Sequence, residues 1–232
     1  MWLQRALLID DRKGWRERAR ESIVDLNDGI VTAAGIAEGF AAAGASTRAL
    51  VFAGATVVLT GGFAAAASCY SEERTEWEMN NRLVDAERAS IEADPAGEFE
   101  ELVAAYEAKG LDTGLARQVA AALTARDPVA AHADTELDLE SIAPARANLF
   151  AAVNAGLFFG LGAAVSLVAI RWLPVGERSE LAYAPVLLAL GLTGWFAAWL
   201  TGLPRLRMVL RNLVLGASTM TAGLIIGHAV AL

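Results

Sequence analysis

The chain has 232 residues, 55% hydrophobic and 20% charged, and its mean hydropathy of +0.41 excludes an ordinary soluble domain. Residues 71–143 carry 18 Asp or Glu and 6 Lys or Arg, a net charge of −12. The remaining residues carry 9 Asp or Glu and 13 Lys or Arg, a net charge of +4. This acidic balance excludes nucleic acid as a partner, because binding phosphates requires a basic surface, and it favours cations.

Residues 1–22 are predicted to form a cytoplasmic N-terminal segment. They contain six basic and four acidic side chains and no continuous apolar run, so we expect no cleavable signal peptide. Cys69 is the only cysteine, which excludes an internal disulfide.

Five segments are long enough to cross a membrane, since a bilayer core about 30 Å thick needs about 20 helical residues. The first runs from near Ile23 to near Ala45 and contains acidic side chains. The other four are free of Asp, Glu, Lys and Arg and cover residues 49–70, 147–170, 181–204 and 212–232. The alternative is that the four uncharged runs are buried core helices of a soluble protein. Four runs of this length in one small chain disfavour that alternative. We therefore predict an all-α membrane protein with five transmembrane helices, two in residues 23–70 and three in residues 144–232.

Basic residues flanking the spans predict their orientation, because cytoplasmic flanks are enriched in Lys and Arg. One basic group precedes the first span and a second lies between the fourth and fifth spans. These residues are Arg5, Arg12, Lys13, Arg16, Arg18 and Arg20, and then Arg205, Arg207 and Arg211. The N-terminus and the acidic segment are then cytoplasmic, and the C-terminus is outside.

Glycine pairs spaced four residues apart occur in three of the spans, which places both glycines on one helix face. Such faces favour close packing between helices, and contacts in a dimer are a second use for them. The pairs are Gly35 with Gly39, Gly156 with Gly160, and Gly223 with Gly227.

The acidic segment, residues 71–143, is predicted to be a soluble insert of three helices between helices 2 and 3. Helix 2 has no breaker before about Ala93. Asp94 and Pro95 then favour a new helix that stops at Gly110, and Asp112 caps a third. The third should bury Leu115, Val119, Ala122 and Leu123, which recur at helical spacing. A short helical segment from Val129 to Leu139 leads back to the membrane.

Carboxylates and one imidazole of the insert are candidate metal ligands. Glu98 and Glu101 share a helix face, as do His132 and Glu136, and Glu87 lies on the extension of helix 2. If these segments pack together, the side chains converge as they do in metal sites between facing helices. Oxygen ligands with one nitrogen suit iron(II), manganese(II) or zinc. A solvated acidic surface without metal is the alternative.

Acidic side chains within the first span are candidates for an ion path, because carboxylates at membrane depth are costly. Glu21, Asp25 and Asp28 form a stripe at its cytoplasmic end. Asp28 and Glu38 lie about 15 Å apart along the axis, which suits two stations along a path. The alternative for Asp25 and Asp28 is an N-terminal helix cap at the headgroup level.

Several stretches resemble the vacuolar iron transporter family and occur in the family's order. Residues 26–46 resemble its first transmembrane helix, residues 92–140 its cytoplasmic metal-binding domain, residues 144–164 its third span and residues 210–232 its fifth. The spans read LNDGIVTAAGIAEGFAAAGAS, PARANLFAAVNAGLFFGLGAA and LRNLVLGASTMTAGLIIGHAVAL.

The resemblance implies a homodimer with five spans that exports iron(II), and often manganese(II), from the cytoplasm in exchange for protons, with no bound cofactor and no enzymatic activity. For a bacterial-type member the expected location is the inner membrane. The ion path would lie between the first helices of the two subunits. Carried over by position, the implied metal residues are Asp28 and Glu21 in the membrane, and Glu87, Glu98, Glu101 and Glu136 in the insert; His132 falls where some members carry methionine.

The chain also departs from the family pattern. A glutamate and a methionine of span two fall on Val57 and Ala65, and a second insert glutamate falls on Ser90, with Glu92 nearby as a substitute. We hypothesise that Glu38 replaces the lost carboxylate of span two. The main rival function is a membrane-anchored metal sensor or buffer without transport. A ferritin-type iron oxidase would need Glu-x-x-His pairs, which the sequence lacks.

Overall fold

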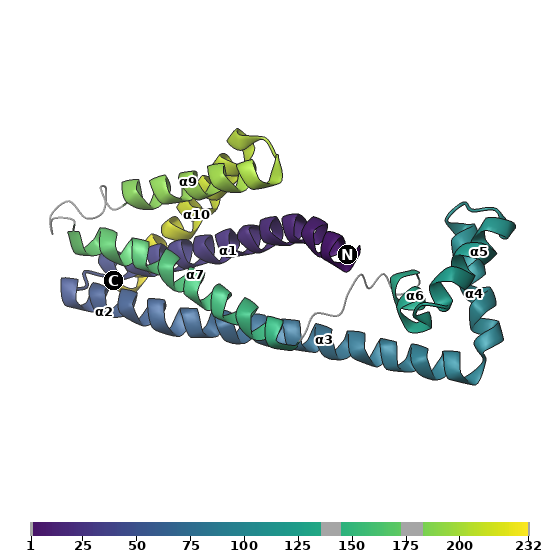
Figure 1. Ribbon diagram of the computed structural model, residues 1–232. Coiled ribbons are helices and arrows are strands. Elements are labelled where there is room, and N and C mark those ends of the chain that lie inside the picture. Colours follow the sequence, from purple (N-terminus) through teal and green to yellow (C-terminus); the bar gives the residue numbers. More distant parts are fainter. Residues whose placement is uncertain (1, 136–144, 173–182, 232) are drawn as a thin grey trace. The chain divides into compact units, whose positions relative to one another are not determined.

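The computed structural model describes residues 2–135, 145–172 and 183–231, and every element in these ranges is a helix. The chain forms two compact units, the first from Met1–Cys69 and Phe150–Leu232, the second from Tyr70–Leu149 (Figure 1). The helices are α1 (Trp2–Ala42), α2 (Thr47–Thr56), η1 (Val57–Gly61), α3 (Gly62–Ala93), α4 (Pro95–Ala108), α5 (Thr113–Thr124), α6 (Pro128–Thr135), α7 (Ala145–Trp172), α9 (Tyr183–Thr201) and α10 (Arg205–Ala231).

Four helical segments in the described residues are long and apolar enough to cross a membrane. They are Thr47–Ala93, Asn148–Ala169, Ala184–Thr201 and Arg205–Ala231, which correspond to the predicted spans two to five. Helix α1 is not among them, because its acidic side chains lower its hydropathy. A fifth span and the cytoplasmic location of the insert therefore stay predictions.

The second span is one helical segment composed of α2, η1 and α3, and it continues to Ala93 as predicted. A short π-helix, η1, interrupts the α-helical geometry at Val57–Gly61. The hydrophobic pattern did not predict this feature, because a π turn changes the local winding of a helix without changing its composition.

Helix α1 packs against four other elements of the first unit. Ile30 and Ala34 are buried against α9 and α10, whereas Ala33 is buried against η1 and α7. The partners on α9 and α10 are Val186, Leu190 and Met220, and those on η1 and α7 are Val57 and Ala163. The most polar of the predicted spans is therefore buried on two sides by other helices of the first unit.

Glycines allow the backbones of these helices to approach closely. A Cβ atom at Gly223 would lie 2.1 Å from the carbonyl oxygen of Gly35, and one at Gly227 would lie 2.1 Å from that of Gly39. These two predicted glycine pairs therefore face each other between α1 and α10. A Cβ at Gly156 of α7 would lie 2.6 Å from the carbonyl oxygen of Gly62 in α3.

Hydrogen bonds between polar side chains also connect α1 to its neighbours. The Asn154 amide of α7 donates to Ser22 Oγ at 2.7 Å, and Ser166 Oγ donates to the carbonyl oxygen of Ile30 at 3.0 Å. On the α9 side, Thr193 Oγ1 lies 2.5 Å from Asn27 Oδ1. Asn154 therefore bonds between helices.

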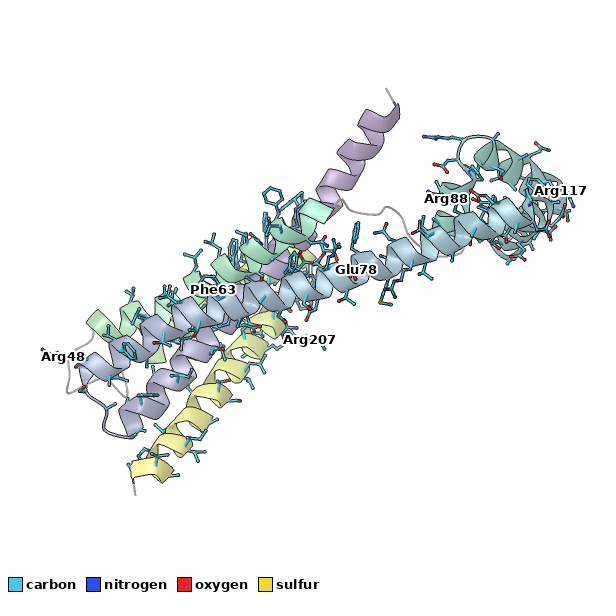
Figure 2. The ribbon with its side chains drawn as sticks, turned by 90° about the horizontal axis from the view of Figure 1, so that it is seen from below. Arg48, Phe63, Glu78, Arg88, Arg117 and Arg207 are labelled. Atoms are coloured by element: carbon cyan, nitrogen blue, oxygen red, sulfur yellow. The ribbon has the colours of Figure 1, made fainter. Side chains whose placement is uncertain are left out.

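Large apolar side chains are exposed on the outside of the first unit. Phe52, Phe63 and Phe150 are each about three-quarters exposed, at 75%, 78% and 74%. Figure 2 labels Phe63 on the segment that begins with α2. Such a surface is unfavourable in water and favourable against lipid. The exposed apolar faces and the lengths of the helices together indicate an integral membrane protein.

The second unit is built from α3 beyond Tyr70, with α4, α5 and α6. Asp94 caps α4 by accepting a hydrogen bond from the Gly97 amide, and Asp112 caps α5 by accepting from Gly114 and Leu115. Gly110, with φ of +98°, occupies the left-handed region just after α4, where glycine is favoured. These predicted helix boundaries are confirmed.

The predicted buried face of α5 is wrong in part. Ala116 and Ala120 are fully buried against α4 and α6, where their partners are Leu102, Val103 and Ala131, whereas Leu115 is 47% exposed. Ala122 is also exposed. The physical reason is that alanine lets two helices approach closely, so the small residues occupy the contact. On the exposed surface of this unit, Arg117 forms two hydrogen bonds to the Glu100 carboxylate (Figure 2).

Candidate metal centre and membrane carboxylates

Three of the predicted metal ligands come together in the second unit. Glu87, Glu98 and His132 each offer a ligand atom, and these atoms all lie within 4.8 Å of one another. His132 Nδ1 lies 3.1 Å from Glu87 Oε1 and 3.8 Å from Glu98 Oε2. The predicted convergence of helices carrying carboxylates and an imidazole is present in the structure.

Each ligand is positioned by a different helix. Glu87 lies on α3, Glu98 lies in the first turn of α4, and His132 lies on α6. The cap at Asp94 fixes where α4 starts and so places Glu98 next to α3. Packing of Ala131 into the core of the second unit holds α6 in place beside α4, and His132 is only 2% exposed.

The spacing of these atoms is compatible with one bound cation. Ligands about 2.1 Å from a tetrahedral ion lie about 3.4 Å from one another, and the two measured distances from His132 Nδ1 fall on either side of that value. Two carboxylates carry the charge needed to balance one divalent ion, and the imidazole adds a nitrogen ligand. This donor set suits iron(II), manganese(II) or zinc.

Other predicted ligands of the insert are not in this cluster. Glu101 is exposed, although it lies one turn from Glu98, and Glu92 is exposed as well. Glu136 lies outside the described residues. Ser90 is the residue that sequence reasoning undervalued: its hydroxyl donates a hydrogen bond to Glu98 Oε1. Only the turn at Asp94 brings Ser90 and Glu98 together, so their spacing in the sequence gave no signal.

Within α1, the acidic stripe is accessible. Glu21 and Asp28 are exposed and Asp25 is half-buried. At 100° per residue, Asp28 projects from the same side of α1 as Gly35 and Gly39. These glycines line an open apolar groove of about 580 Å³ between α1 and α10. Gly35 is buried and Gly39 half-buried against α10, whereas the Asp28 side chain, further along the same face, is exposed.

Glu38 has a different environment. It is buried, with 5% exposure, and ten residues of ideal helix separate it by about 80° around the axis from Asp28. It also projects about 140° away from Ala33, which is the α1 residue that contacts Val57. The geometry therefore gives no support to Glu38 as a replacement at the Val57 position, and this hypothesis stays to be tested.

Comparison with known proteins identifies the family of the chain. The family model described as "VIT family" matches residues 19–228. A similar protein is the "Vacuolar iron transporter" of Acanthamoeba castellanii, 29% identical over 214 residues, which cover 90% of this chain and 73% of the relative. The chain belongs to the VIT family. The resemblance seen in the sequence is thereby confirmed.

As a VIT-family member, the chain carries a distinctive second span. Val57, at the position where the resemblance leads one to expect glutamate, is 9% exposed and packs against Ala33 and Ala163. It also begins the π-helix η1. Ala65, at the expected methionine position, is half-buried. In this VIT-family protein the second span therefore contributes an apolar contact where a ligand was expected.

Proposed function

We propose that this protein transports divalent metal ions, iron(II) and also manganese(II), out of the cytoplasm in exchange for protons. The observation that carries the proposal is the convergence of Glu87, Glu98 and His132 in a chain of the VIT family. The relative named as a vacuolar iron transporter supports iron as the ion.

The three-ligand cluster is proposed to collect the ion. Carboxylates attract hydrated divalent cations and raise their local concentration, and a buried imidazole gives the site selectivity over calcium and magnesium, which prefer oxygen ligands. On this proposal the second unit is the cytoplasmic insert, in agreement with the basic flanks of the spans.

Asp28 is proposed to bind the ion within the membrane. Its exposure on α1 and the apolar groove beside it support a homodimer in which the first helices of two copies face each other. Two Asp28 carboxylates would then replace part of the hydration shell of one ion. In this arrangement α1 is the first of five spans, and its acidic side chains face the ion path in place of lipid.

Proton exchange is proposed to release the ion. A protonated carboxyl group is a poor metal ligand, so protons arriving from the outer side at Asp28 would lower its affinity. The orientation follows from the basic flanks, with the N-terminus inside and the C-terminus outside, in the inner membrane of a bacterium.

A metal sensor or buffer without transport is the second candidate. The observation that favours it is the packing of Val57. This residue makes an apolar contact at the position where a transport ligand was expected. The two candidates differ in one measurable respect, because only the transporter moves ions across a sealed membrane.

The test is metal flux into proteoliposomes that contain an iron-sensitive dye. Transport predicts dye quenching that depends on an imposed pH gradient and is lost in Asp28→Asn. Asp85→Asn, which changes an exposed carboxylate of α3 outside the cluster, is the matched control and should keep wild-type flux. Binding of metal by the purified protein with no flux would establish the sensor and refute the transporter.

A further inference from the structure

The short loop between α3 and α4 places a hydroxyl group next to the metal cluster. Asp94 is the single residue between the two helices, and the Ser90 hydroxyl donates a hydrogen bond to Glu98 Oε1 across this turn. The other carboxylate oxygen, Oε2, is the one that lies 3.8 Å from His132 Nδ1. The two oxygens of Glu98 therefore have different partners.

This division of roles restricts how Glu98 can bind an ion. With Oε1 held by Ser90, the carboxylate presents Oε2 to the cluster. The rotation of the carboxylate is restricted before any ion arrives, so less conformational entropy is lost on binding. Hydrogen bonds from outer groups to ligating carboxylates commonly orient the ligand in this way.

We propose that Ser90 is a positioning residue for Glu98, and that the cluster of Glu87, Glu98 and His132 holds a single divalent ion. This inference rests on the proposed function of the cluster and deepens it by assigning a stoichiometry and a supporting residue. A carboxylate at position 90 would add a third charged group beside Glu98. Serine instead supplies a donor, which leaves two carboxylates, the charge for one divalent cation.

Among the other nearby acids, Glu92 is the competing explanation. It lies two residues after Ser90 and could supply a ligand in place of the missing glutamate. The structure leaves Glu92 exposed and outside the group of ligand atoms that lie within 4.8 Å of one another. A variant at Glu92 therefore distinguishes a supporting hydroxyl from a substituted ligand.

The experiment measures cobalt(II) binding to the full-length protein in detergent, by visible absorption for the coordination shell and by equilibrium dialysis for stoichiometry. The variants are Ser90→Ala, Ser90→Thr and Glu92→Gln. Because Ser90 is exposed and helical, Ser90→Ala should fold normally, and circular dichroism checks this.

We expect one high-affinity cobalt ion per chain at the cluster, counted in an Asp28→Asn background that lacks the proposed membrane site. Ser90→Ala should weaken binding by about 10- to 100-fold, the range typical of outer-shell partners. Ser90→Thr should restore most of the affinity because it keeps the hydroxyl, and Glu92→Gln should bind like wild type.

Three results would overturn the inference: unchanged affinity in Ser90→Ala, equal loss in Glu92→Gln, or two or more high-affinity ions per chain when Asp28→Asn has removed the proposed membrane site. A different result would refute the proposed function of the cluster. A wild-type protein that binds no cobalt, iron or manganese at the cluster refutes metal collection itself, whereas wild-type binding that is insensitive to Ser90→Ala refutes only the role of Ser90.

Discussion

Gly223 of α10 lies against Gly35 of α1 so closely that a Cβ atom at position 223 would be 2.1 Å from the carbonyl oxygen of Gly35. That oxygen belongs to the backbone, so it cannot move without shifting α1. The approach of two helices at this point therefore depends on the absence of a side chain.

Replacing Gly223 with alanine should separate α1 from α10. We expect Gly223→Ala to lower the free energy of unfolding by about 1–3 kcal/mol, the usual cost of overpacking, as measured by thermal or denaturant unfolding in detergent. Gly191→Ala in α9 is the matched control, because a Cβ there meets nothing within 4 Å. Equal effects of the two substitutions would contradict the packing described.

The contact between Asn27 and Thr193 should stabilise the packing of α1 on α9. Interhelical hydrogen bonds in membrane proteins contribute about 0.6 kcal/mol on average. A double-mutant cycle with Asn27→Ala and Thr193→Val should give a coupling free energy of about this size. Additive effects of the two substitutions would show that the hydroxyl and amide do not interact.

The buried face of α5 can be tested by exchanging small and large residues. Ala120→Leu places extra volume in a fully buried contact, so it should destabilise the protein by about 1–3 kcal/mol. Leu115→Ala changes a half-exposed side chain and should cost less than about 1 kcal/mol. If Leu115→Ala were the more damaging change, the face predicted from hydrophobic spacing would be the correct one.

His132 should be required for metal binding, whereas Glu101 should not. His132→Phe keeps a ring of similar size in the buried position but removes the nitrogen ligand. It should weaken cobalt binding by at least about 10- to 100-fold, the cost of losing even an outer-shell group. Glu101→Gln removes an exposed carboxylate outside the cluster, and dialysis should show affinity close to that of the wild type.

Glu38 offers a test of whether a buried acid of α1 takes part in transport. If Glu38 serves as a second station for the ion or for protons, Glu38→Gln should reduce iron flux into proteoliposomes while leaving cobalt binding to the second unit unchanged. Wild-type flux in this variant would remove Glu38 from the path and leave Asp28 as the acidic residue of α1 to examine.

Helix boundaries were predictable from the sequence where one or two neighbouring residues determine them. Asp94, Pro95, Gly110 and Asp112 set helix boundaries through capping and backbone conformation, and the structure follows them. The lengths of the uncharged runs likewise predicted the apolar segment that begins with α2 and the helices α7, α9 and α10, because a helix must bury its apolar surface in lipid or in protein.

The candidate metal centre was predictable only in outline. The helical register placed Glu87, Glu98 and His132 on helices that could meet. It did not distinguish Glu98 from Glu101, because both are glutamates and they lie only one turn apart. The turn at Asp94 and the packing of α4 against α5 and α6 decide that Glu98 enters the cluster and Glu101 remains exposed.

The sequence by itself determined the apolar helices, the caps of α4 and α5 and which residue types could bind a cation, because these depend on composition and local backbone chemistry. Only the tertiary structure decided that Gly35 and Gly39 face α10, that Ala116 and Ala120 form the contact face of α5, and that Ser90 meets Glu98. Those relationships join residues on different helices, and the close approach of helices is set by the shape of the whole contact.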